Sequence, residues 1–87
     1  MKKKILVTGG LGFIGSHTSL KLLEKNYEII ILDNLSNSKI EVISRIKNLA
    51  KKDFEFIEGD IRDRNLLRNI FKKYVIDSVI HFAGLKA

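Results

Sequence analysis

Four glycines crowd one short segment that lies between a run of apolar residues and a longer amphipathic stretch. The segment reads TGGLGFIG over residues 8–15 and contains the spacing Gly10-x-Gly12-x-x-Gly15. Alone this pattern is weak, but here it follows a predicted strand over 4–8 and opens a predicted helix over 13–25. In such a turn one glycine allows the sharp bend, one brings bare backbone close to a pyrophosphate, and one lets the helix pack on the strand. A role in packing alone is the alternative interpretation.

The rest of the chain alternates short β-rich runs with longer amphipathic ones. Further strands are predicted over 28–33, 54–58 and 77–82, and further helices over 38–50 and 64–74. Ser38 and Glu41 have capping-box spacing, which predicts that the second helix starts at Ser38. Residues 29–32 are all apolar, which is typical of a strand covered on both faces.

The resulting order, β-α-β-α-β-α-β, predicts the fold class. Strands joined through helices run parallel, and their crossovers are right-handed. The expected fold is α/β, a Rossmann-type parallel sheet that forms the first portion of a doubly wound domain. No linker interrupts the pattern, so residues 1–87 are expected to belong to one domain.

Composition excludes several other classes of protein. The 87 residues include no cysteine, which removes disulfide scaffolds and thiolate metal sites, and no metal site is predicted. No apolar stretch reaches the length of a membrane span, so no membrane partner is expected. No signal peptide is visible, because only a short apolar run follows the lysines at positions 2–4, and a cytoplasmic location is the default.

The chain carries a formal net charge of +6, from 16 Lys and Arg against 10 Asp and Glu. A basic surface attracts polyanions, so a nucleic-acid-binding domain is one alternative. The basic residues are dispersed, however, and no aromatic residues interleave with them as base-stacking platforms. A solvated surface is the better interpretation, and no nucleic-acid partner is expected.

Two acids follow predicted strands. Asp33 ends the second strand, about 20 residues beyond the glycine turn, where an acid accepts hydrogen bonds from the diol of an adenosine ribose. Because a carboxylate there would repel a 2′-phosphate, the sequence favours NAD over NADP; the alternative is a carboxylate that caps the next loop. Asp60, after the third strand, could reach an adenine edge or cap the next helix. Ligands of such sheets bind outside the carboxyl ends of the strands at the switch point, here between the first and fourth strands.

The sequence also resembles a known family. Residues 8–17, TGGLGFIGSH, look like the start of the extended short-chain dehydrogenases/reductases that act on nucleotide sugars. Three stretches are more specific: ILDNLSNS over 31–38, EGDIR over 58–62 and HFAGLKA over 81–87. Together they resemble the UDP-glucose 4-epimerases of that family, and the match runs the length of the chain.

The resemblance implies that the cofactor is NAD and assigns residues to it. Residues of the glycine turn and helix start would contact the pyrophosphate, and polar residues after the second strand would hold the adenosine ribose. Residues after the third strand would flank the adenine, and those after the fourth would line the middle of the cofactor. In chain order these are Gly9, Gly12, Phe13, Ile14 and Gly15; Asp33, Asn34, Asn37 and Ser38; Asp60 and Ile61; and Phe82, Ala83, Gly84 and Lys86.

The resemblance further implies an isomerase activity for the whole protein, which would be a homodimer that interconverts UDP-glucose and UDP-galactose. In that family a Tyr and a Lys four residues later carry out the proton chemistry. Here Tyr27 is followed at that distance by Ile31, and Tyr74 by Ser78, so no catalytic residue is assigned. The chain therefore looks like an amino-terminal fragment without the second half of the NAD-binding domain or the substrate domain, and it is expected to be inactive alone.

Two further alternatives stay open. One is a non-catalytic dinucleotide-binding module. The other is a fragment of a nucleotide-sugar dehydratase or decarboxylase, because those enzymes share the glycine turn.

Overall fold

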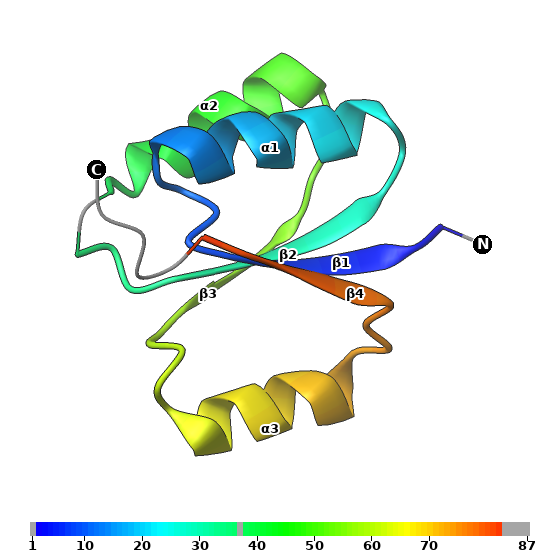
Figure 1. Ribbon diagram of the computed structural model, residues 1–87. Helices are drawn as coiled ribbons and strands as arrows, with labels where there is room; N and C mark the ends of the chain where they lie inside the picture. Colours follow the sequence, from blue (N-terminus) through cyan, green and yellow to red (C-terminus); the bar gives the residue numbers. More distant parts are fainter. Residues whose placement is uncertain (1, 37, 83–87) are drawn as a thin grey trace.

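The computed structural model describes residues 2–36 and 38–82, whose elements follow the expected order (Figure 1). The strands are β1 (Lys4–Thr8), β2 (Glu28–Asp33), β3 (Glu55–Glu58) and β4 (Ser78–His81). The helices are α1 (Phe13–Glu24), α2 (Glu41–Ala50) and α3 (Arg64–Lys73). Each predicted element is present, and the bounds agree closely with the prediction except at the start of α2.

The strands form one parallel sheet in the order β3-β2-β1-β4. At the carboxyl end of β1, Thr8 pairs with Leu32 of β2 on one side and with His81 of β4 on the other. From β1, the strands β2 and β3 thus extend the sheet in one direction, and β4 lies on the opposite side of β1. This order confirms the Rossmann-type α/β fold and puts the switch point beside Thr8.

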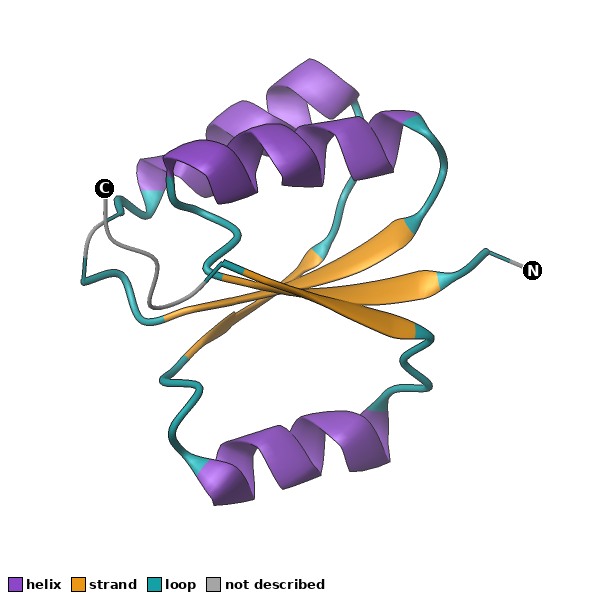
Figure 2. Cartoon of the chain, in the orientation of Figure 1, coloured by secondary structure: helices purple, strands orange, loops and turns teal. Residues whose placement is uncertain are grey.

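Helices cover both faces of the sheet, as the apolar strands predicted. α1 and α2 lie over one face, and α3 lies over the other (Figures 1 and 2). Because successive side chains of a strand point to opposite faces, β1 and β2 supply two apolar clusters. The cluster on the side of α1 and α2 includes Ile5, Val7, Leu23, Ile29, Ile31 and Ile46. The cluster on the side of α3 comprises Leu6, Ile30, Leu32 and Ile70.

The start of α2 differs from the sequence prediction. The helix begins at Glu41, its N-cap residue is Ile40, and no side chain among the described residues caps it. Ser38 instead donates its hydroxyl hydrogen to Asp33 Oδ1 at 3.0 Å. A hydrogen bond to a carboxylate is stronger than one between neutral groups, so this contact holds Ser38 in the loop after β2. The predicted capping box is therefore wrong.

Helix α3, in contrast, begins with a side-chain cap. Asp63 Oδ1 accepts a hydrogen bond from Leu66 N at 3.1 Å, which satisfies one of the free N–H groups of the first turn. Of the two acids near this helix start, Asp63 is the cap. Asp60 is thereby left free for another role.

The helices in the described part of the chain are too short or too polar to cross a membrane. Over the same residues, no three His, Asp or Glu side chains gather closely enough to hold a metal ion.

Candidate functional site

The turn between β1 and α1 uses its glycines in different ways. Gly9 has a φ angle of 71°, a left-handed conformation that glycine adopts without strain. A β-carbon at Gly15 would lie 2.1 Å from Gly9 O, so the close approach of α1 to the turn requires glycine there. A β-carbon at Gly12 would meet Gly9 O at 3.5 Å, which is an ordinary contact. Gly9 and Gly15 thus shape the turn, while Gly12 leaves uncovered backbone at the helix start.

The first turn of α1 presents main-chain N–H groups that no side chain of the described residues caps. Its N-cap is Gly12, and its first turn contains no acidic residue. Phe13 and Ile14 are 84% and 58% exposed. Because a helix start has free N–H groups and about half a unit of positive charge, it attracts an anion such as a phosphate. The local geometry therefore provides an anion site beside the glycine turn.

Asp33 connects the end of β2 to two loops. Its Oδ2 accepts a hydrogen bond from Leu11 N at 3.1 Å, and its Oδ1 accepts from Leu35 N at 2.8 Å and from Ser38 Oγ at 3.0 Å. The residue is only 7% exposed. The bond to Leu11 joins the acid directly to the glycine turn, so these two features lie at the same end of the sheet.

These bonds limit what else the Asp33 carboxylate can accept. A carboxylate offers about four lone-pair positions, and Oδ1 already has two donors. A ribose diol that contacts both oxygens therefore needs one donor on Oδ1 to leave. Ser38 is the donor that can do so, because a hydroxyl rotates more easily than a main-chain N–H. Asp33 thus holds the loop after β2, and its position beside the glycine turn is the one expected for ribose recognition.

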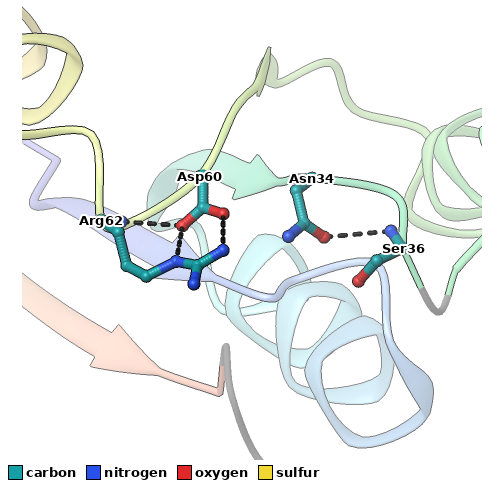
Figure 3. Close-up of polar contacts among 4 residues, drawn as sticks. All are labelled: Asn34, Ser36, Asp60 and Arg62. Carbon is teal, nitrogen blue, oxygen red and sulfur yellow. Dashed lines mark hydrogen bonds and ion pairs between the residues drawn. The ribbon is translucent and has the colours of Figure 1, made fainter.

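Beyond β3, Asp60 and Arg62 form a pair near Asn34 (Figure 3). Arg62 Nε and Nη2 donate to Asp60 Oδ1 at 3.1 Å and Oδ2 at 2.8 Å, and Arg62 N donates to Oδ1 at 2.8 Å. The hydrogen bonds from the Arg62 side chain are the largest cause that lowers the pKa of Asp60, to about 2; the Asn34 side chain contributes less. Asp60 is therefore ionised near neutral pH. Asn34 Oδ1 accepts a hydrogen bond from Ser36 N at 3.0 Å, which tightens the adjacent loop.

At the switch point, side chains and backbone join β1 to β4. Thr8 Oγ1 and His81 Nδ1 share a hydrogen bond of 2.6 Å, and Phe82 N donates to Thr8 O at 2.7 Å. Thr8 is buried. These bonds hold Phe82 next to the start of the glycine turn. His81 is therefore joined to β1 by its side chain.

The structure brings most of the predicted site residues to the carboxyl edge of the sheet. That edge carries the glycine turn after β1, Asp33 and Asn34 after β2, Asp60 after β3, and Phe82 after β4. Ile61 is partly buried and packs against the apolar cluster on the side of α3. Four predicted residues lie outside the described residues: Asn37, Ala83, Gly84 and Lys86.

Sequence patterns did not indicate two participants in this arrangement. Leu11 acts through its main-chain N–H, so its side chain carries no signal. Arg62 stands two residues after Asp60, and that spacing was the available signal for a local ion pair.

Comparisons with known proteins agree with this architecture. A family model described as GDP-mannose 4,6 dehydratase matches residues 6–87. The UDP-glucose 4-epimerase of Neisseria meningitidis serogroup B is 59% identical over 85 residues, which are 98% of this chain and 25% of that protein. The UDP-glucose 4-epimerase of Bacillus subtilis is 54% identical over 83 residues, which are 95% of this chain and 24% of that protein. The crystal structure of UDP-glucose 4-epimerase from Bifidobacterium longum in complex with NAD+ and UDP matches with a TM-score of 0.94 and 45% identity, over 98% of this chain and 25% of that chain.

The parallel sheet, the glycine turn after its first strand and the acid after its second define the Rossmann class of nucleotide-binding folds. Within that class the chain belongs to the GDP-mannose 4,6 dehydratase family, and it resembles the UDP-glucose 4-epimerases. The chain spans about a quarter of the length of these two curated epimerases.

Proposed function

We propose that this chain binds the adenosine and pyrophosphate portion of NAD at the carboxyl edge of its sheet. The observation that carries the proposal is the 3.1 Å hydrogen bond from Leu11 N to Asp33 Oδ2, which joins the phosphate-binding turn to the ribose-binding acid. The residues present fit this cofactor. Gly12 leaves backbone uncovered where a pyrophosphate would lie, and the uncapped start of α1 offers N–H donors from Phe13 and Ile14.

The charge at Asp33 supports NAD over NADP. A carboxylate accepts hydrogen bonds from a ribose diol and repels a 2′-phosphate. Ser38 would release Oδ1 when the ribose hydroxyl takes its place. The remaining proposed contacts to the cofactor come from the loops after β2, β3 and β4. They are made by Asn34, Asn37, Asp60, Ile61, Phe82, Ala83, Gly84 and Lys86.

For the whole protein we propose the activity of a UDP-glucose 4-epimerase. The identities of 54–59% to curated enzymes of that name support it, and so does the likeness to an epimerase crystallised with NAD+ and UDP. When bound, NAD supplies reversible hydride transfer at C4 of the sugar. The residues of this chain would bind and orient the cofactor. The Tyr–Lys pair that the family resemblance implies for proton transfer is not among them, because neither Tyr27 nor Tyr74 is followed four residues later by a lysine.

Residues 1–87 would then form the amino-terminal part of a larger NAD-binding domain. The coverage of about a quarter of the Neisseria meningitidis and Bifidobacterium longum epimerases supports this division. The UDP-sugar would bind to parts of the protein outside these residues. We also propose that the whole protein is a cytoplasmic homodimer, which sedimentation of the purified protein and cell fractionation would test.

Activity measurements test the proposal. The protein at its natural length is expected to convert UDP-galactose to UDP-glucose in a coupled assay, and the 87 residues alone are expected to give no turnover. Turnover by the 87 residues would contradict the division of roles. Absence of both NAD binding and epimerisation in the natural-length protein would overturn the proposed function.

The description of the matching family model supports a second candidate, a nucleotide-sugar dehydratase. The same cofactor contacts would serve that reaction. Incubation with GDP-mannose and with UDP-galactose, followed by analysis of the sugar products, separates the two. Loss of water from the sugar would favour the dehydratase, and a change of configuration at C4 would favour the epimerase.

A further inference from the structure

The carboxylate of Asp60 and the guanidinium of Arg62 meet in a two-pronged pair just beyond β3 (Figure 3). Nε and Nη2 of Arg62 reach the two oxygens of Asp60 at 3.1 and 2.8 Å, and the main-chain N of Arg62 adds a third bond at 2.8 Å. A planar, two-pronged contact fixes the direction of a carboxylate, which a single point charge does not. Arg62 therefore controls how the Asp60 carboxylate is turned.

This orientation is not required by the core or by the neighbouring helix. The side chain of Arg62 is 87% exposed, and ion pairs that are this exposed contribute little to stability. The start of α3 is capped by Asp63, which accepts the hydrogen bond from Leu66 N. The pair between Asp60 and Arg62 is thus available for recognition at the edge of the sheet.

Arg62 also determines which acceptor positions Asp60 retains. Oδ1 receives two donors from Arg62, which fill its two lone pairs. Oδ2 receives one donor from Arg62 and keeps a second position. The geometry therefore directs a ligand N–H group to Oδ2.

We propose that Arg62 is a positioning residue for base recognition: it holds Asp60 so that Oδ2 accepts a hydrogen bond from the exocyclic amine of adenine. This inference rests on the proposed binding of NAD at the same edge. Hypoxanthine carries a carbonyl oxygen where adenine carries the amine, and a carboxylate repels that oxygen. The site therefore binds adenine more tightly than hypoxanthine, and Arg62 determines the ratio of the two affinities.

The test compares the Kd values of NAD and of nicotinamide hypoxanthine dinucleotide, measured by calorimetry on nucleotide-free protein of natural length. The unchanged protein is expected to bind NAD tighter by about 10-fold or more, as a hydrogen bond to a charged group allows. Arg62→Lys keeps the positive charge but loses the two-pronged contact, so the preference is expected to fall below about 3-fold. Arg68→Lys, at an exposed position of α3, is the matched control and should leave the preference unchanged.

The ratio of the two Kd values separates this role from a structural one. If Arg62→Lys weakened both dinucleotides equally, Arg62 would act on the loop or by stacking on the base, and the inference would be overturned. An unchanged preference in Arg62→Lys, or no preference in the unchanged protein, would overturn it as well, while the binding of NAD stood. Failure of the unchanged protein to bind NAD would overturn the proposed function itself.

Discussion

Three donors converge on the carboxylate of Asp33, and they come from two separate loops. Leu11 belongs to the glycine turn, whereas Leu35 and Ser38 belong to the loop after β2. Two of the donors are main-chain N–H groups, which substitution of their own side chains does not remove. Replacement of Asp33 itself is therefore the change that measures what these hydrogen bonds contribute to stability.

Asp33→Asn keeps the size of the side chain but replaces one oxygen by an NH2 group. In either orientation of the amide, that NH2 faces Leu11 N or Leu35 N, and one main-chain donor loses its acceptor. The free energy of unfolding is expected to fall by about 1–3 kcal/mol, as for other unsatisfied buried groups. Urea unfolding at neutral pH measures the loss. An unfolding free energy equal to that of the unchanged protein would contradict the role assigned to Asp33.

Gly15→Ala and Gly12→Ala form a matched pair in one turn. The new β-carbon at Gly15 would lie 2.1 Å from Gly9 O, so the backbone must move, at a cost of about 1–3 kcal/mol. At Gly12 the nearest contact is 3.5 Å, and the expected cost is below about 1 kcal/mol, mainly from a poorer helix N-cap. Thermal unfolding compares the stabilities, and NAD titration should show weaker binding for both variants. Equal destabilisation by the two changes would contradict the claim that a β-carbon is excluded at Gly15 but tolerated at Gly12.

Asp60 provides a pH-dependent prediction. Hydrogen bonds from Arg62 lower its pKa from 3.8 to about 2 in the folded chain. Because the folded value lies below the unfolded one, the ionised pair favours the folded state above about pH 4. That contribution is lost as the pH falls through about 2. In a carboxyl NMR titration, the Asp60 signal should shift near pH 2, and in Arg62→Ala its midpoint should move upward, because the two side-chain hydrogen bonds are lost while the main-chain N–H of residue 62 remains. The same midpoint in both proteins would contradict the pairing.

At the scale of elements, the sequence predicted the sheet because β1 and β2 are apolar along both faces, and such runs fit a covered parallel strand. The glycine turn and Asp33 were also predictable, since their spacing follows from strand and helix lengths. The start of α2 was not. A capping box is a local pattern, whereas the contact of Ser38 with Asp33 depends on how the loop after β2 folds back.

The first turns of α2 and α3 give a prediction at the scale of elements. Asp63→Ala removes the side-chain cap of α3 and is expected to cost about 1 kcal/mol. The loss should appear as faster hydrogen exchange in the first turn of α3. Ser38→Ala is the comparison, because Ser38 does not cap α2, and exchange in the first turn of α2 should remain unchanged. Faster exchange in the first turn of α2 would indicate that Ser38 caps this helix, as the capping-box spacing predicted and contrary to the structure.

At the scale of the whole molecule, the two ends of the sheet differ in chemistry. The carboxyl end carries the glycine turn, Asp33 and Asp60. At the amino end lies an open groove of about 460 Å³, with Lys4, Tyr27 and Tyr74 in its lining. Lys4 Nζ lies 3.5 Å from Glu28 Oε2 and 5.2 Å from the centre of the Tyr74 ring, so its charge already has partners within the groove. The amides that line this groove therefore serve as a control when NAD is added, because the proposed NAD site lies at the opposite end of the sheet.

Amide chemical shifts recorded while NAD is added to the isotope-labelled protein of natural length test most directly where the dinucleotide binds. We predict that the largest shifts fall on the amides of Leu11, Phe13, Ile14 and Leu35, at the carboxyl edge of the sheet. The amides of Tyr27 and Tyr74 in the opposite groove should stay in place. Shifts concentrated in that groove, or no shifts at millimolar NAD, would contradict the proposed binding of NAD to the glycine turn and Asp33.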